Sequence, residues 1–176
     1  MIEILWLGRG GQGAFTAAKL LGAAYSAKGG EYFALAFPSF GPERRGAPVR
    51  AFTKLDGKPV LDRSETEKAD YIVILDETLY SEGLTKSLKN GGKILINSKS
   101  RGKYQSGENI SVFDGNAIAA ELGLPTANTV MLGFLAAASG AVSAEDICLS
   151  IDGYMPEKIR EKNKAAVLRT EKEAVK

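Results

Sequence analysis

A glycine-rich segment near the start of the chain restricts the fold more than any other feature. This segment, Gly8-Arg-Gly-Gly-Gln-Gly13, separates an apolar run at 2–7 from a stretch at 14–28 whose apolar residues have helical spacing. The apolar run, Ile-Glu-Ile-Leu-Trp-Leu, predicts a β-strand, and the glycine pair at 29–30 predicts the end of the helix. A second strand is predicted at 32–37. This order favours a βαβ unit with parallel strands and a right-handed crossover.

The rest of the chain continues the alternation of strands and helices. Strands are predicted at 49–53, 70–75, 93–97 and 110–113, and helices at 78–89, 115–122, 127–139, 144–151 and 156–173. Asn90-Gly91-Gly92 is predicted to end the first of these helices. Asp56-Gly57 predicts a hairpin turn with a returning strand at 60–61, and thus an antiparallel excursion at one edge. We therefore predict one Rossmann-like α/β domain over residues 1–176, with a mainly parallel, doubly wound sheet.

The counts of histidine and cysteine exclude several kinds of site. The 176 residues include no histidine, so no Ser-His or Cys-His pair and no imidazole-bound zinc can form within the chain. The single cysteine, Cys148, cannot build a disulfide framework or hold an iron–sulfur cluster by itself. We therefore expect no metal site in this chain and a reducing, cytoplasmic environment.

Charge and hydropathy argue against two classes of partner. Lys and Arg number 23 and Asp and Glu 21, and the resulting net charge of +2 is too small to indicate nucleic acid or a membrane surface. The longest apolar stretch, at 130–142, is shorter than the roughly 20 residues that span a bilayer. Residues 2–7 resemble a strand rather than a signal peptide. We expect neither nucleic acid nor a membrane as a partner.

The spacing of three glycines suggests an anion site. Gly8, Gly10 and Gly13 match G-x-G-x-x-G, between a predicted strand and a predicted helix. Glycine lets the backbone approach a ligand closely, and the first turn of the following helix presents free N–H groups to an anion. The pattern therefore predicts binding of an anion or nucleotide. The alternative is a tight turn without a ligand.

The second strand does not fit a nicotinamide dehydrogenase. Such enzymes need an acidic residue for the ribose hydroxyls at the end of that strand, about 20 residues beyond the glycines. Here Phe37-Pro38 occupies this position, and Glu31 lies at the opposite end of the strand. The sequence therefore disfavours NAD.

A second candidate loop follows the second strand. Residues 38–46 read Pro-Ser-Phe-Gly-Pro-Glu-Arg-Arg-Gly, and they should emerge beside the glycine loop because parallel strands share a carboxyl edge. Arginine binds phosphate and carboxylate well, and serine adds a hydroxyl. The predicted site therefore consists of Gly10, Gly11, Gln12, Gly13, Ser39, Arg44 and Arg45. The alternative is an exposed loop with an ion pair between Glu43 and one arginine.

These residues carry a resemblance to a known family. The glycine loop, together with Ala36-Phe-Pro-Ser-Phe-Gly-Pro-Glu-Arg-Arg-Gly-Ala-Pro-Val49, resembles the gamma subunit of pyruvate:ferredoxin oxidoreductase (pyruvate synthase), in the 2-oxoacid:ferredoxin oxidoreductase superfamily. Asn128-Thr-Val-Met-Leu-Gly133 and the Lys162-Asn163 pair also look like this family. The resemblance spans essentially the whole chain and favours the pyruvate or branched-chain 2-oxoacid branch.

The resemblance implies a complex that converts pyruvate, CoA and oxidised ferredoxin into acetyl-CoA, CO2 and reduced ferredoxin. It implies thiamine diphosphate, Mg and [4Fe–4S] clusters on alpha, beta and delta partner subunits, with ferredoxin reached through the complex. This chain would then bind no cofactor alone and hold no catalytic residue, and it would help to bind CoA and to assemble the complex. Two alternatives stay open, a purely structural assembly subunit of a branched-chain 2-oxoacid enzyme and a free-standing nucleotide-binding protein.

Overall fold

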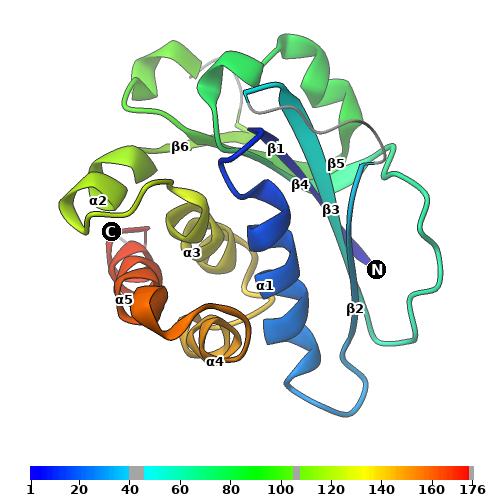
Figure 1. The fold of residues 1–176 in the computed structure, drawn as a ribbon. Coiled ribbons are helices and arrows are strands. Elements are labelled where there is room, and N and C mark those ends of the chain that lie inside the picture. Colours follow the sequence, from blue (N-terminus) through cyan, green and yellow to red (C-terminus); the bar gives the residue numbers. More distant parts are fainter. Residues whose placement is uncertain (40–45, 105–107, 175–176) are drawn as a thin grey trace.

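The sheet contains six strands in the order β2-β3-β1-β4-β5-β6 (Figure 1). The computed structural model describes residues 1–39, 46–104 and 108–174. The strands are β1 (Ile2–Arg9), β2 (Phe33–Pro38), β3 (Pro48–Asp56), β4 (Ala69–Ile74), β5 (Leu88–Asn97) and β6 (Ile110–Phe113). β1, β4, β5 and β6 pair in parallel, whereas β3 pairs antiparallel with both β1 and β2. The prediction of a mainly parallel α/β sheet is confirmed.

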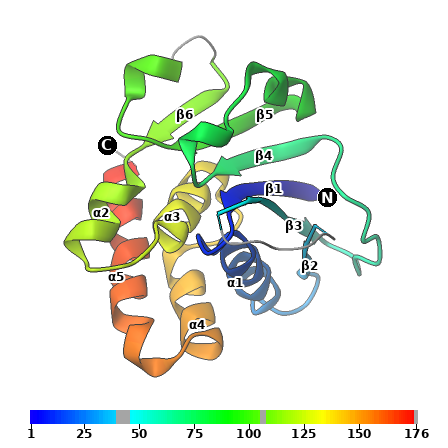
Figure 2. The same ribbon diagram turned by 45° about the horizontal axis from the view of Figure 1, so that its top comes forward.

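Helices cover one face of this sheet and short 3₁₀ turns cover the other (Figure 2). The helices are α1 (Ala14–Ser26), α2 (Gly115–Glu121), α3 (Asn128–Ser139), α4 (Ala144–Tyr154) and α5 (Glu157–Ala174). The 3₁₀ turns are η1 (Glu77–Leu79), η2 (Glu82–Ser87) and η3 (Arg101–Tyr104). The chain moves from β1 through α1 toward one edge of the sheet, and from β4 through η1 and η2 toward the other, as in a doubly wound fold. No helix among the described residues is both long and apolar enough to cross a membrane.

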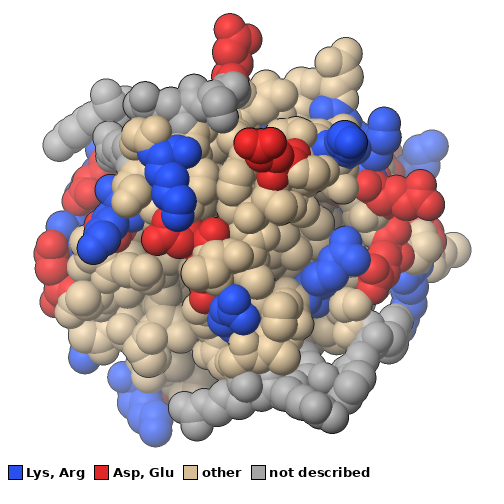
Figure 3. Space-filling model, turned by 90° about the horizontal axis from the view of Figure 1, so that it is seen from above, with Lys and Arg blue, Asp and Glu red and all other residues tan. Residues whose placement is uncertain are grey.

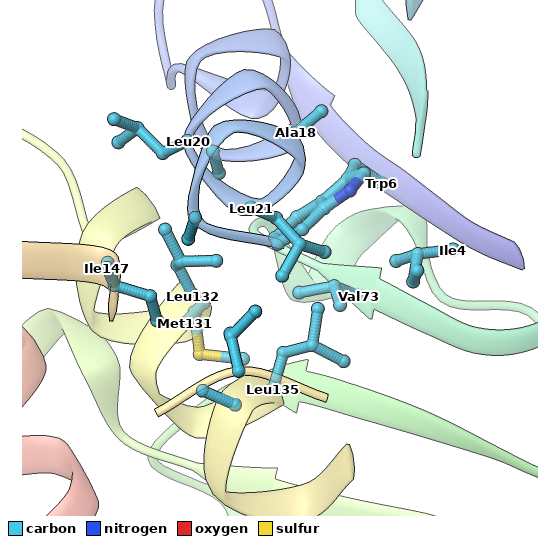
Figure 4. Close-up of a cluster of buried hydrophobic side chains, with 14 of the residues drawn as sticks. Ile4, Trp6, Ala18, Leu20, Leu21, Val73, Met131, Leu132, Leu135 and Ile147 are labelled. Atoms are coloured by element: carbon cyan, nitrogen blue, oxygen red, sulfur yellow. The ribbon is translucent and has the colours of Figure 1, made fainter. Parts of the chain in front are cut away.

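The core explains why β1 reads as a nearly continuous apolar run. Ile4 and Trp6 pack under the helices, while Leu5 and Leu7 pack on the opposite face, so that both faces of the strand are buried. Figure 4 shows Trp6 pointing toward side chains of α1 and α3. The indole Nε1 of Trp6 donates to Thr53 Oγ1 at 3.0 Å, so its polar atom is also satisfied.

The α-helix predicted at 78–89 is wrong. Two 3₁₀ turns, η1 and η2, occupy this region, and β5 already begins at Leu88. Asn90-Gly91-Gly92, predicted to end a helix, lies within β5, where the pairing with β4 is irregular. The physical reason is length, because this short connection must return from the carboxyl end of β4 to the amino end of β5. A 3₁₀ turn rises about 2.0 Å per residue and an α-helix about 1.5 Å, so 3₁₀ turns cover the same distance with fewer residues.

The hairpin predicted at Asp56-Gly57 is also wrong. Residues 60–61 form no strand, and the connection over 57–68 has no regular secondary structure. Both edges of β3 are already paired, with β1 on one side and β2 on the other, so no edge is free for a returning strand. The antiparallel excursion in the described chain is instead β3 itself.

Candidate functional site

The glycine loop connects β1 to α1 through a turn that requires glycine at two positions. Gly11 has a φ of 95° and Gly13 a φ of 78°, in the left-handed region that other residues avoid. The Gln12 N–H donates to Arg9 O at 2.9 Å and closes the turn. Gly13 then stands at the N-cap of α1 and makes no side-chain cap. The local sequence therefore dictates both the turn and the start of the helix.

A hollow of about 340 Å³ lies where the loop enters α1. It is lined by Arg9, Gly10, Gly11, Gly13, Ala14, Phe15, Thr16, Val49 and Arg50. Within the described residues, the N–H groups of Gly11 and Gly13 donate to no acceptor, and the N–H groups of residues 14–16 have no partner inside the helix because they belong to its first turn. These amides and the positive end of the helix dipole suit an anion.

The two loops predicted to meet do so at their described ends. Gly10 N donates to Ala47 O at 2.9 Å, and Gly46 N donates to Gly10 O at 3.2 Å. The meeting follows from the topology, because β1 and β2 end at the same edge of the sheet and β3 begins there. Figure 3 views the molecule from the side that carries this edge, and uncharged residues fill much of the centre of that face. Arg44 and Arg45 lie outside the described residues.

Ser39 follows β2 and bonds to β3 and to the 57–68 connection. Its N–H donates to Arg50 O at 2.9 Å, and its hydroxyl donates to the carboxylate of Glu65 in the 57–68 connection. Ser39 is not among the residues that line the hollow. The side chain of Arg50 also pairs with Glu65, at 3.2 Å, and its guanidinium carbon lies over the ring of Phe52, 5.6 Å from the ring centroid. The structure thus ties Ser39 to the connection rather than to the glycine loop.

The Gln12 side chain points toward β4 rather than toward the hollow. Its Oε1 accepts from Arg9 N at 2.8 Å, and its Nε2 donates to Asp76 Oδ2 at 3.4 Å. Asp76 follows β4 and is the residue of this site that sequence reasoning missed most clearly. Partial burial opposes its charge, but hydrogen bonds from Thr78 and the nearby charge of Arg9 outweigh the burial and lower the pKa of Asp76.

The crevice between β1 and β4 is largely filled. Open α/β sheets bind dinucleotides where the direction of strand order reverses, which in this sheet is between β1 and β4. The hollow there measures only about 80 Å³, against roughly 300 Å³ or more for an ordinary ligand pocket. It is lined by Gln12, Leu75, Asn116, Pro125, Thr126 and Ala127. This geometry disfavours a dinucleotide in the usual position.

Across the described ranges, no cluster of His, Cys, Asp or Glu could hold a metal ion.

Comparison with known proteins gives consistent results. The family model described as pyruvate ferredoxin/flavodoxin oxidoreductase matches residues 3–172. The chain is 45% identical to the pyruvate synthase subunit PorC of Methanothermobacter thermautotrophicus, covering 94% of this chain and 92% of the relative. It is 41% identical to the common subunit gamma of the pyruvate/ketoisovalerate oxidoreductases of Thermococcus kodakarensis, covering 94% and 93%. The crystal structure of the pyruvate oxidoreductase subunit PORC of Thermotoga maritima superposes with a TM-score of 0.82 at 34% identity, covering 97% and 95%.

Proposed function

The chain belongs to the pyruvate ferredoxin/flavodoxin oxidoreductase family, and we propose that it serves as the gamma subunit of such an enzyme, where its glycine loop helps to bind CoA. The family model and the relatives extend over nearly the whole chain, which supports a single gamma-type domain over residues 1–176. The enzyme would convert pyruvate, CoA and oxidised ferredoxin into acetyl-CoA, CO2 and reduced ferredoxin.

In this proposal the chain contributes binding and assembly rather than bond breaking. Thiamine diphosphate with Mg, and [4Fe–4S] clusters, would supply the electron sink and the electron acceptors on alpha, beta and delta partners. The residues of this chain would hold the nucleotide end of CoA and orient it toward the partner that carries out the chemistry. Such positioning lowers the entropic cost of the reaction. The cytoplasmic location stays a prediction.

The single observation that carries the proposal is the hollow at the start of α1. Its volume of about 340 Å³ suits a diphosphate with part of its nucleoside, and its free amides are the groups that bind phosphate at helix N-termini. Two arginines line the hollow, but Arg9 is paired with Asp76 and Arg50 with Glu65, so a diphosphate would need further cations. We propose that Arg44 and Arg45, in the segment just before Gly46, supply them.

The test uses the assembled enzyme with Arg44→Ala, Arg45→Ala and the double variant. We expect the dissociation constant of CoA to rise about tenfold or more for the double variant, because charge-assisted hydrogen bonds to phosphate are lost. Arg63→Ala, an exposed arginine of the 57–68 connection, is the control for loss of positive charge.

The outcomes separate CoA binding from a purely structural role. Weaker CoA binding with normal assembly supports the proposal. Unchanged CoA affinity in a complex that assembles poorly would instead favour the assembly subunit, whose loop contacts only protein. If both properties stay unchanged, the two arginines have neither role. Native mass measurement of the complex reports assembly in each case.

A further inference from the structure

We propose that Arg9 is a positioning residue that holds the glycine loop, the start of β3 and the turn after β4 in one arrangement. This role does not require Arg9 to contact a ligand. The proposal rests on the function proposed above only for one of its two readouts, the binding of CoA. Its other readout is the order of the loop itself.

The guanidinium of Arg9 bonds to three groups from two other segments. Nε donates to Asp76 Oδ2 at 3.1 Å, one terminal nitrogen donates to Thr78 Oγ1 at 2.8 Å, and the other donates to Gly46 O at 3.1 Å. Asp76 and Thr78 follow β4, whereas Gly46 precedes β3. One side chain thus links three segments that lie at the same edge of the sheet.

The partners of Arg9 are themselves held in place. Both carboxylate oxygens of Asp76 are engaged, since Oδ2 also accepts from Gln12 Nε2 and Oδ1 accepts from the N–H and the hydroxyl of Thr78. The Thr78 hydroxyl therefore donates to Asp76 and accepts from Arg9, which uses its only proton and one lone pair. Three of the five N–H groups of the guanidinium thus have acceptors in the fold, and these acceptors set its direction.

This arrangement acts on the hollow through Gly46. The carbonyl of Gly46 takes the Arg9 bond, while the N–H of Gly46 bonds to Gly10 O and Gly10 N bonds to Ala47 O. Among the described residues, loss of the guanidinium would leave the two backbone bonds and the pairing of β1 with β3 to hold the segment before β3 against the glycine loop. Lysine cannot replace Arg9, because a single ammonium group does not present the fixed fork of donors that these acceptors require.

The first experiment measures kinetics of the assembled enzyme with Arg9→Lys. We expect the KM for CoA to rise roughly tenfold while the KM for pyruvate stays unchanged, because only the CoA hollow is disturbed. Thr78→Val should raise the KM for CoA in the same direction, and Thr78→Ser, which keeps the hydroxyl, should restore it. Arg169→Lys is the matched control, since the Arg169 guanidinium also bonds to more than one group, Glu121 and Glu173, and its side chain is 37% exposed against 34% for Arg9.

The second experiment measures hydrogen exchange of the Gly10 and Gly46 amides in the same complexes. Faster exchange at both amides in Arg9→Lys, together with a higher KM for CoA, supports the proposal. Unchanged exchange would overturn the positioning role, whatever happens to CoA. Faster exchange with an unchanged KM for CoA would support the positioning role and overturn the function proposed for the hollow, so the two failures are distinguishable.

Discussion

The side-chain amide of Asn128 donates a hydrogen bond of 3.3 Å to the carbonyl oxygen of Gly13, which stands 115 positions earlier in the chain. Asn128 is the first residue of α3 and is only 8% exposed. Its Oδ1 accepts from Thr126 Oγ1 at 2.8 Å. The start of α3 therefore holds the end of the glycine loop in place.

We expect Asn128→Ala to lower the free energy of unfolding by about 1–3 kcal/mol. The variant removes the partner of the Thr126 hydroxyl, and the partly buried carbonyl of Gly13 loses this bond but keeps the one from Ala17 N. Urea unfolding of the chain measures the change. Thr126→Ala keeps the bond to Gly13, and it should cost less than Asn128→Ala. Equal costs for the two variants would contradict a bracing role for Asn128.

Two glycines of the loop should respond differently to alanine. Both Gly11 and Gly13 have positive φ, so each alanine variant should lose roughly 1–2 kcal/mol of stability from backbone strain. At Gly13 a Cβ atom would also overlap the Asn128 amide, whereas at Gly11 it would meet open space. We therefore expect Gly13→Ala to be clearly the more destabilising of the two in thermal unfolding. A larger effect at Gly11 would be inconsistent with this packing.

The space around a helical glycine should decide whether its replacement by alanine raises or lowers the stability of the protein. At Gly133 in α3, a Cβ atom would lie 3.1 Å from the Val167 carbonyl oxygen in α5, and we expect Gly133→Ala to destabilise the protein. At Gly22 in α1, the nearest atom would be 3.5 Å away, an ordinary contact. Gly22→Ala should therefore stabilise the protein by about 0.5–1 kcal/mol through helix propensity. Chemical denaturation measures the free energy of unfolding of both variants, which should fall for Gly133→Ala and rise for Gly22→Ala.

Acid should weaken the connection over 57–68 through Asp62. Hydrogen bonds from the buried ammonium of Lys54, at 2.6 Å, and from Ser64 lower the pKa of Asp62 far below its ordinary value. A lowered folded-state pKa stabilises the protein above the unfolded pKa of about 3.9, and this stabilisation is lost as the pH falls toward the folded value. The stability difference between wild type and Asp62→Asn should therefore be constant from pH 7 to about pH 5 and should shrink below about pH 4.

Urea midpoints measured from pH 7 to pH 2 check this dependence on Asp62. Glu67→Gln, in the same connection, is the control for loss of a negative charge. A difference between wild type and Asp62→Asn that stays constant down to pH 2 would show that the contact with Lys54 does not depend on the charge of Asp62.

The sequence alone determined the strands, turns and helices that depend on residues close together in the chain. The apolar run of β1 and the glycines after it predicted a strand, a turn and a helix, because left-handed φ values at Gly11 and Gly13 are a property of glycine itself. The helices predicted at 144–151 and 156–173 correspond to α4 and α5, since apolar spacing along a helix is a local signal. The structure adds a capping box of Ser143 with Asp146 at the start of α4. The glycine loop as a candidate site followed from the same local signals.

Only the tertiary structure decided how these elements pair and what surrounds the site. The return of β3 between β1 and β2 depends on which strand edges are free, and the 3₁₀ turns after β4 depend on the distance to β5. Asp76 is 67 positions from Arg9 in sequence, and Asn128 is still farther from Gly13. Spacing along a chain carries no signal for such contacts, because they exist only once the sheet has brought separate strand ends to one edge.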